Sequence, residues 1–205
     1  MKEERVCFKS GSLAIEGLYG NGSGAGCALI THPHSQMGGS MHNNVVDAMV
    51  GAFQKRGYAT LRFNFRGVGK SEGYFDNGLG EQEDVKSARR FIEGKGAADI
   101  ILAGYSFGAW VNSLVVVGGE IFSDFVMVSP PIEFLDFDLS GLSGKCGLII
   151  CGDRDQFSPI DPLRKEASRI GAPLRVVKGA DHFYFGREMG ICEYLEEYLA
   201  AKRIE

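Results

Sequence analysis

Two segments of the chain carry the pattern Gly-x-Ser-x-Gly, which can place a serine hydroxyl on a sharp turn between a strand and a helix. One covers residues 69–73 and the other covers residues 104–108. The second follows the apolar run Ile-Ile-Leu-Ala and precedes residues with helical spacing, whereas no helical pattern follows the first. Ser106 is therefore the candidate nucleophile, and Ser71 is interpreted as a loop residue.

A serine hydroxyl is a poor nucleophile without a neighbouring base, and histidine is the usual one. Among the four histidines, His182 follows the last predicted strand and comes after Ser106 in the chain. This is the order serine, acid, histidine that such strand–turn–helix serine sites use. His182 is the candidate base. The amide of Phe107 opens the helix after the serine, where free N–H groups favour negative charge, so it is the candidate donor to an oxyanion.

The acid that orients the histidine is expected on a loop after another strand, between the serine and the histidine. Asp153 and Asp155 both follow the predicted strand at 146–151. Asp155 lies further from the strand, where its loop can reach across to the histidine, so it is favoured as the orienting acid. Asp153 is expected to hold the turn. Asp136 and Asp138, after the preceding strand, remain alternatives.

Hydrophobic periodicity predicts strands that alternate with helices after an N-terminal antiparallel hairpin at residues 4–19. The other predicted strands cover residues 27–31, 58–65, 100–104, 125–128, 146–151 and 174–177. The predicted helices cover residues 43–56, 81–93, 107–117, 159–170 and 187–202. This order predicts an α/β fold with a mostly parallel sheet covered by helices on both faces. Ligands of such sheets bind beyond the carboxyl ends of the strands, where the candidate residues lie.

The composition is that of a globular protein and indicates no polyanionic partner. The 205 residues include 22 basic and 26 acidic side chains, for a net charge of −4, so no basic excess predicts nucleic-acid binding. No apolar run is long enough for a membrane span, and the N-terminus lacks the features of a signal peptide. The odd number of cysteines, five, favours buried thiols in a reducing compartment. We therefore expect one domain over residues 1–205, in the cytoplasm.

Taken together, the motifs resemble the α/β-hydrolase superfamily over about residues 27–199. The resemblance rests on Gly-Tyr-Ser-Phe-Gly at 104–108, Gly-x-x-Asp-x-x-x-Pro at 152–159, Asp181-His182, and the segment 62–73, which is similar to a loop of many members. The chain looks closest to small bacterial hydrolases with a His-Pro-His…Gly-Gly-x-Met-His-Asn segment. It is more distantly similar to feruloyl-type esterases and dienelactone-hydrolase-like enzymes. The resemblance implies the α/β-hydrolase fold.

In this superfamily the loop after the first parallel strand often begins His-Gly, and the next residue gives the second oxyanion N–H. Aligning His32-Pro33 with this pair implies that role for His34, with Ser35 as the alternative. Pro33 departs from the common glycine and fixes its own backbone angle, so this loop is preset differently.

Many members insert a lid domain after the strand that ends here near Val128, but segment 129–145 is too short for one. The resemblance therefore implies an open, shallow site that favours small or exposed acyl groups over long lipids. The expected pocket residues are those that flank the catalytic candidates, namely His32, Ser35, Trp110, Phe157 and Phe183.

These observations predict a serine hydrolase that cleaves a small carboxylic ester or thioester through an acyl-enzyme intermediate. We expect no cofactor, because segment 62–71 lacks the first glycine of a phosphate-binding loop. We expect no metal, because His32 and His34 lie on a loop without nearby cysteine. An acyltransferase or a peptidase with the same triad remains an alternative. So does a non-catalytic binding or scaffold protein on the same fold, although the intact serine, acid and histidine argue against it.

Overall fold

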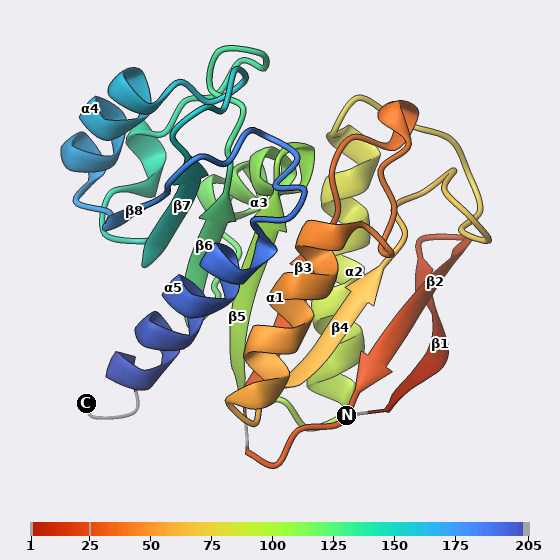
Figure 1. The fold of residues 1–205 in the computed structure, drawn as a ribbon. Coiled ribbons are helices and arrows are strands. Elements are labelled where there is room, and N and C mark those ends of the chain that lie inside the picture. Colours follow the sequence, from red (N-terminus) through yellow and green to blue (C-terminus); the bar gives the residue numbers. More distant parts are fainter. Residues whose placement is uncertain (1, 25, 203–205) are drawn as a thin grey trace.

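A computed structural model describes residues 2–24 and 26–202, so residues 1, 25 and 203–205 of the predicted domain lie outside the described residues. The chain forms an eight-stranded sheet in the order β1-β2-β4-β3-β5-β6-β7-β8 (Figure 1). The N-terminal hairpin of β1 and β2 is antiparallel, and β2 joins β4 antiparallel. The other six strands, β4, β3, β5, β6, β7 and β8 in sheet order, run parallel to one another. This is the predicted α/β-hydrolase architecture.

The elements alternate as the sequence predicts, with small shifts at their ends. The strands are β1 (Glu3–Ser10), β2 (Leu13–Gly20), β3 (Gly26–Thr31), β4 (Ala59–Phe63), β5 (Asp99–Tyr105), β6 (Asp124–Val128), β7 (Leu148–Gly152) and β8 (Leu174–Val177). The helices are α1 (Asn44–Lys55), α2 (Leu79–Gly94), α3 (Phe107–Val117), α4 (Ile160–Ile170) and α5 (Glu188–Lys202), with short 3₁₀ helices η1 (Ser35–Met37) and η2 (Ser140–Leu142). Among the described residues, no helix is both long and apolar enough to cross a membrane.

Two of the shifted boundaries have a local cause. Helix α2 begins at Leu79 rather than at Glu81, because the Glu81 carboxylate accepts hydrogen bonds from the amides of Asp76 and Gly78 and closes the first turn. Strand β4 ends at Phe63 rather than at Phe65, because the amide of Phe65 donates to the His32 ring instead of to a neighbouring strand.

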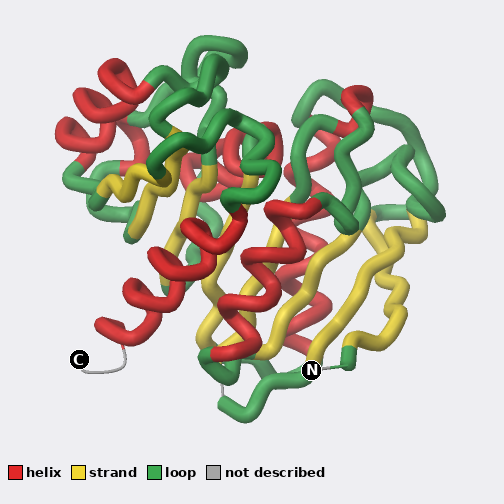
Figure 2. Tube along the Cα trace, viewed as in Figure 1, coloured by secondary structure: helices red, strands yellow, loops and turns green. Residues whose placement is uncertain are grey.

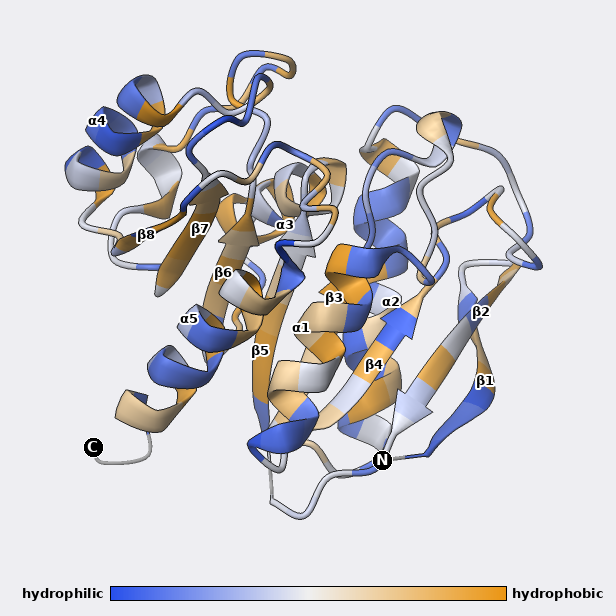
Figure 3. Cartoon of the chain, in the orientation of Figure 1, coloured by the Kyte–Doolittle hydropathy of each residue, from blue (hydrophilic) through white to orange (hydrophobic). Residues whose placement is uncertain are grey.

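Both faces of the sheet are covered, which explains why the central strands are apolar without alternation. Helices α1 and α5 pack on one face, and α2, α3 and α4 pack on the other. Figure 3 shows β5, β6 and β7 in mostly apolar colours. The longer loops gather at the carboxyl ends of the parallel strands (Figure 2). There, the connection from β6 to β7 contains only the short helix η2 and no lid domain.

Buried Arg62 of β4 ties three other segments to the sheet. Its guanidinium donates to both carboxylate oxygens of Glu3 on β1, at 3.0 and 2.5 Å. It also donates to the carbonyl of Met41 at 2.9 Å and pairs with Asp47 on α1. The guanidinium thus has two carboxylates and a carbonyl as partners. A substitution that removes the guanidinium leaves all three without this partner.

We expect Arg62→Met to lower the free energy of unfolding by about 2 kcal/mol, because the mostly buried Glu3 carboxylate loses its cation and the Met41 carbonyl loses its donor. Arg5→Met is the matched control, because Arg5 lies exposed on β1, and we expect it to change stability by less than about 0.5 kcal/mol. Urea denaturation of both variants measures the difference. Equal effects would contradict a stabilising role for the Arg62 cluster.

Candidate active site

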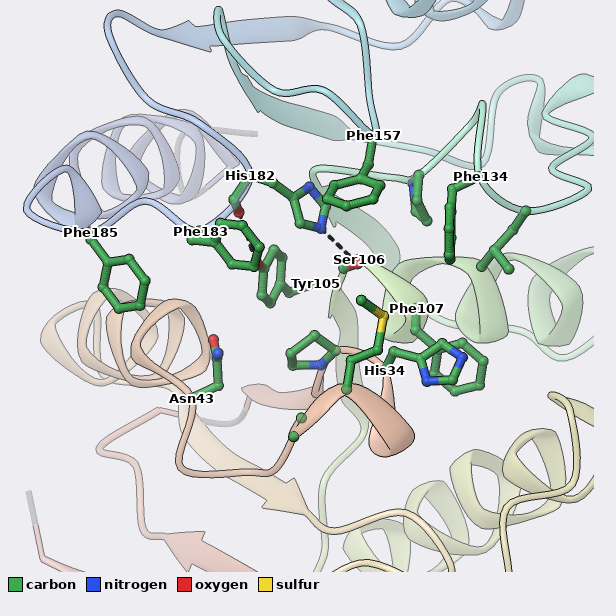
Figure 4. A pocket seen from close by; sticks show the side chains of 16 residues that line it. His34, Asn43, Tyr105, Ser106, Phe107, Phe134, Phe157, His182, Phe183 and Phe185 are labelled. Carbon is green, nitrogen blue, oxygen red and sulfur yellow. Dashed lines mark hydrogen bonds between the residues drawn. The ribbon is translucent and has the colours of Figure 1, made fainter.

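The turn between β5 and α3 holds Ser106 in an unusual backbone conformation. Its φ is 55° and its ψ is −119°, outside the regions that L-residues prefer. The amide of Ser106 donates to the carbonyl of Val128 on the neighbouring strand β6 at 3.0 Å, and its carbonyl accepts from Trp110 in α3 at 3.1 Å. These bonds hold the turn at the carboxyl end of the sheet, with the side chain of Ser106 directed into a cavity (Figure 4).

The two glycines of this turn are required by close packing. A Cβ atom on Gly104 would lie 2.6 Å from the Asn112 side chain and 2.7 Å from the backbone of α3. A Cβ atom on Gly108 would lie 2.5 Å from Oγ1 of Thr31 and 2.7 Å from the carbonyl of His32. The pattern Gly-x-Ser-x-Gly therefore reflects how tightly α3 packs against β5 and the end of β3.

One hydrogen-bonded chain joins three side chains from the loops after β5, β7 and β8. Oγ of Ser106 lies 2.9 Å from Nε2 of His182 (Figure 4). Nδ1 of His182 lies 2.9 Å from both carboxylate oxygens of Asp155. Because a carboxylate only accepts, Nδ1 carries the hydrogen and Nε2 is left to accept from the Ser106 hydroxyl. All three side chains are buried.

The Asp155 carboxylate is buried and remains the ionised partner of this chain. Burial raises the pKa of Asp155, but the hydrogen bond and charge of His182 and the donors around it bring the pKa below its usual value. Two of these donors are the amides of Phe157 and Ser158, each 3.0 Å from Oδ1. The loop after β7 thus wraps around its own aspartate.

The loop after β8 presents His182 through contacts with its own residues and with β5. The hydroxyl of Tyr105 donates to the carbonyl of His182 at 2.7 Å. The carboxylate of Asp181 accepts from the amides of Phe183 and Tyr184, so it turns back on its own loop and away from the histidine ring. Both contacts fix the backbone that carries the imidazole.

A cavity of about 240 Å³ opens beside Ser106 and His182. None of the described residues that line it is Asp, Glu, Lys or Arg. Aromatic rings dominate its wall, contributed by Tyr105, Phe107, Phe134, Phe157, Phe183 and Phe185. Its mouth is apolar and exposed, because Met37, Phe134, Phe183 and Phe185 are 64%, 54%, 44% and 77% exposed. The cavity therefore suits an uncharged, apolar group.

Known proteins share this fold and much of this sequence. An uncharacterised protein of Rickettsia prowazekii is 32% identical over 210 residues, which cover 95% of this chain and 88% of the relative. The structure of an α/β serine hydrolase homologue from Coxiella burnetii is 34% identical, covers 96% of this chain and 97% of that one, and gives a TM-score of 0.87. The chain belongs to the α/β-hydrolase superfamily.

A member of the α/β serine hydrolases without a lid, from Xanthomonas campestris, is 25% identical to this hydrolase. The match covers 98% of this chain and 95% of that one, with a TM-score of 0.87. No family model matches the chain. These likenesses agree with the short β6–β7 connection of this hydrolase.

Three of the expected pocket residues of the hydrolase do not line its cavity. His32 is fully buried, where Nδ1–H donates to the carbonyl of Pro33 at 2.7 Å and Nε2 accepts from the amide of Phe65 at 3.0 Å. Burial lowers its pKa to about 4, so this imidazole is neutral and joins the loops after β3 and β4. Trp110 packs on Gly78 and donates to the carbonyl of Asp136 at 2.9 Å.

Ser35, the third of these residues, begins helix η1, and its hydroxyl is buried without a hydrogen-bond partner among the described residues. The other two expected pocket residues, Phe157 and Phe183, do lie in the cavity wall. In the part of the chain that the structure describes, no group of three or more His, Cys, Asp or Glu side chains is placed to hold a metal ion.

The two expected oxyanion donors, Phe107 and His34, lie together at the cavity. Phe107 is the first residue of α3, so its amide has no acceptor within the helix. Its ring lies 4.8 Å from the ring of His34, and both residues line the cavity with Ser106. Burial lowers the pKa of the His34 ring, whose Nδ1 accepts from the amide of Gln36.

The alternative acids and the second serine have other partners. Asp153 accepts from the amide of Gly179 at 2.6 Å and so holds the turn after β8. The Asp138 carboxylate accepts from the amide and the hydroxyl of Ser140 at the start of η2, and the carbonyl of Asp136 accepts from the Trp110 ring. The hydroxyl of Ser71 donates to the carbonyl of Asn64 at 2.6 Å and accepts from the amide of Glu16. Ser71 therefore fixes a loop, as the sequence predicts.

Sequence reasoning missed several cavity residues, among them Met37, Tyr105, Phe134 and Phe185. Tyr105 directly precedes Ser106 in the Gly-x-Ser-x-Gly pattern, so the sequence alone could have placed it near the cavity. Phe134 and Phe185 lie on loops after β6 and β8, beyond the strand ends at which ligands bind, and only the fold shows that they line the same cavity as Ser106.

We expect Gly108→Ala to lower the free energy of unfolding by about 2 kcal/mol, because the new methyl group must displace the backbone at the end of β3. Gly51→Ala is the control, because Gly51 lies exposed in α1 with nothing within 4 Å of a Cβ atom. We expect it to stabilise the hydrolase by about 0.5 to 1 kcal/mol. Thermal or urea unfolding gives both values, and a neutral Gly108→Ala would show that the turn between β5 and α3 packs more loosely than described.

Proposed function

We propose that this protein is a serine hydrolase that cleaves a carboxylic ester or thioester through an acyl-enzyme intermediate, and that residues 1–205 work as one domain. Ser106 is the nucleophile, His182 is the general base and acid, and Asp155 orients the imidazole. The observation that carries the proposal is the unbroken hydrogen-bonded chain from Ser106 to Asp155 at the wall of a cavity.

In the acylation step, Oγ of Ser106 attacks the substrate carbonyl while Nε2 of His182 takes its proton. The carbonyl oxygen becomes an oxyanion, for which the amides of Phe107 and His34 are the proposed donors. The tetrahedral intermediate collapses, and His182 gives the proton to the departing alcohol or thiol. Water then attacks the acyl-enzyme, with His182 taking its proton. The second tetrahedral intermediate collapses, and His182 returns the proton to Oγ of Ser106 as the acid is released. Asp155 stays ionised throughout and stabilises the imidazolium.

The lining of the cavity supports an uncharged acyl group of modest size. A volume of about 240 Å³ holds about eight groups the size of a water molecule, at about 30 Å³ each. A carboxylate on the acyl group would be desolvated there with no lysine or arginine among the described lining residues to pair with it. Esters and thioesters are favoured over amides, because an alcohol or thiol leaves more readily than an amine.

We expect a fluorophosphonate probe to form one adduct with the wild-type protein and none with Ser106→Ala, because only the activated serine reacts with it. Ester hydrolysis by Ser106→Ala should fall by at least about 10³-fold. Ser71→Ala is the matched control, a serine from the same sequence pattern, and it should retain the adduct. Intact mass spectrometry reads the labelling. Folded wild-type protein without an adduct would favour the non-catalytic binding protein instead.

We expect kcat/KM for p-nitrophenyl esters to rise by up to about fourfold for each added methylene, as apolar surface is buried at about 0.8 kcal/mol per methylene, and to level off at about six to eight carbons when the cavity is full. A half-ester of a diacid of the same length should react at least about 100-fold more slowly than the neutral diester, because its carboxylate must enter an apolar wall. A faster charged substrate would contradict this assignment.

A further inference from the structure

Two buried residues with hydroxyl side chains lie on loops next to the candidate triad and do not line the substrate cavity. Ser129 is the first residue after β6, and Tyr184 follows His182 by two positions on the loop after β8. Both residues are fully buried, and their hydroxyl oxygens lie 2.8 Å apart. The reaction described above uses neither of them.

The backbone conformations at these positions are unusual as well. Four non-glycine residues of the described chain have positive φ, and three of them are Ser106, Ser129 and Tyr184, at 55°, 46° and 57°. Each such conformation costs of order 1–3 kcal/mol and persists where the surroundings hold it in place, most often at active sites. The amide of Ser129 is held by the carbonyl of Ile150 on β7 at 2.8 Å. Three of the four strained positions are therefore the candidate nucleophile and the two hydroxyl residues.

The direction of the hydrogen bonds follows from what each group can do. The hydroxyl of Ser129 is among the groups that lower the pKa of Asp155, and because a carboxylate only accepts, a hydrogen bond between the two requires Ser129 as the donor. Oγ of Ser129 must then accept from the hydroxyl of Tyr184. Burial raises the pKa of Tyr184 well above its usual value, so the phenol keeps the proton that it donates.

The other titratable groups around Asp155 are His182, the thiol of Cys151 and the phenol of Tyr105. Sγ of Cys151 lies 3.9 Å from Oδ2 of Asp155, and burial raises its pKa to about 12, so the thiol is neutral. The hydroxyl of Tyr105 donates to a backbone carbonyl, and burial keeps it protonated by raising its pKa. Among the described groups around Asp155, His182 is therefore the one that can bring positive charge to the carboxylate, and the others are neutral.

We propose that Ser129 and Tyr184 are positioning residues of this hydrolase, which hold the Asp155 carboxylate ionised and aimed at His182 through the chain Tyr184 to Ser129 to Asp155. The proposal rests on the proposed function, because it assigns the two hydroxyls to the same triad. Tyr184 is joined to both ends of the acid–base pair, since it lies on the His182 loop and reaches Ser129 beside the acid.

The test compares Tyr184→Phe, Ser129→Gly and the double variant with wild type. Tyr184→Phe removes one oxygen and keeps the buried ring. Ser129→Gly removes the hydroxyl while suiting the left-handed backbone, so any loss of activity reports the hydroxyl rather than the turn. Tyr194→Phe is the matched control, because the Tyr194 hydroxyl donates at 3.2 Å to the carbonyl of Val176 and does not contact Asp155.

We expect each single variant to lower kcat about tenfold with KM changed less than about twofold, because the substrate cavity is untouched. The acid limb of the kcat/KM profile should move to higher pH, since an Asp155 carboxylate whose donor is lost or weakened attracts a proton on the neighbouring imidazole more strongly. The double variant should resemble the single ones, because one break already interrupts the chain. Tyr194→Phe should match wild type in both readouts.

Labelling of wild-type protein by a fluorophosphonate separates the two claims. If wild type labels Ser106 but the variants keep its kcat and its pH profile, the positioning role is wrong and the proposed hydrolase activity stands. The same holds if Tyr184→Phe and Ser129→Gly lose stability but not kcat, since that would make the hydroxyls structural only. If folded wild type neither labels nor hydrolyses esters, both the proposed function and this inference are overturned.

Discussion

At Ser106 the chain leaves a buried strand and enters a helix within one residue, and the backbone does so in the left-handed region. That conformation is tolerated because α3 packs directly on β5 and on the end of β3, an approach that leaves no room for side chains at Gly104 and Gly108. The same packing sets where the loop after β3 begins, and so where His34 meets Phe107. A serine hydroxyl, a free helix amide and the neighbouring loop are therefore positioned by one steric constraint.

The rest of the candidate site follows from the order of the strands. Strands β5, β6, β7 and β8 are successive neighbours in the sheet and run parallel, so their carboxyl ends present Ser106, Ser129, Asp155 and His182 at one edge. Neighbouring ends are also bonded to one another, since the amides of Ser106 and Ser129 donate to carbonyls of β6 and β7. Donors from three of these loops stabilise the buried negative charge of Asp155, so the acid can remain ionised away from water.

The features that could be predicted from the sequence are those with a local signature. Apolar runs and helical spacing locate the elements, and the contrast between the helix after Ser106 and the loop after Ser71 separates two identical patterns. Asp155 could be preferred over Asp153 because reach along a loop is a matter of sequence distance. The direction of a side chain could not be predicted in this way. His32 and Trp110 lie near the strand ends that carry the site, yet His32 turns inward to join two loops and Trp110 packs on Gly78. Ser129 and Tyr184 meet only through strand pairing, which no local pattern encodes.

Strand β8 is short and lies at the edge of the sheet, paired on one side with β7 alone. Elements of this kind open by local unfolding at a lower free energy than the central strands, whose opening requires the whole domain to unfold. His182 is carried by the loop that follows β8, whereas Ser106 follows the central strand β5. The proposed base is thus attached to the least protected segment of the catalytic edge and the nucleophile to one of the most protected. On heating, this hydrolase would lose its acid–base partner through subglobal opening while the serine turn and the core remained folded.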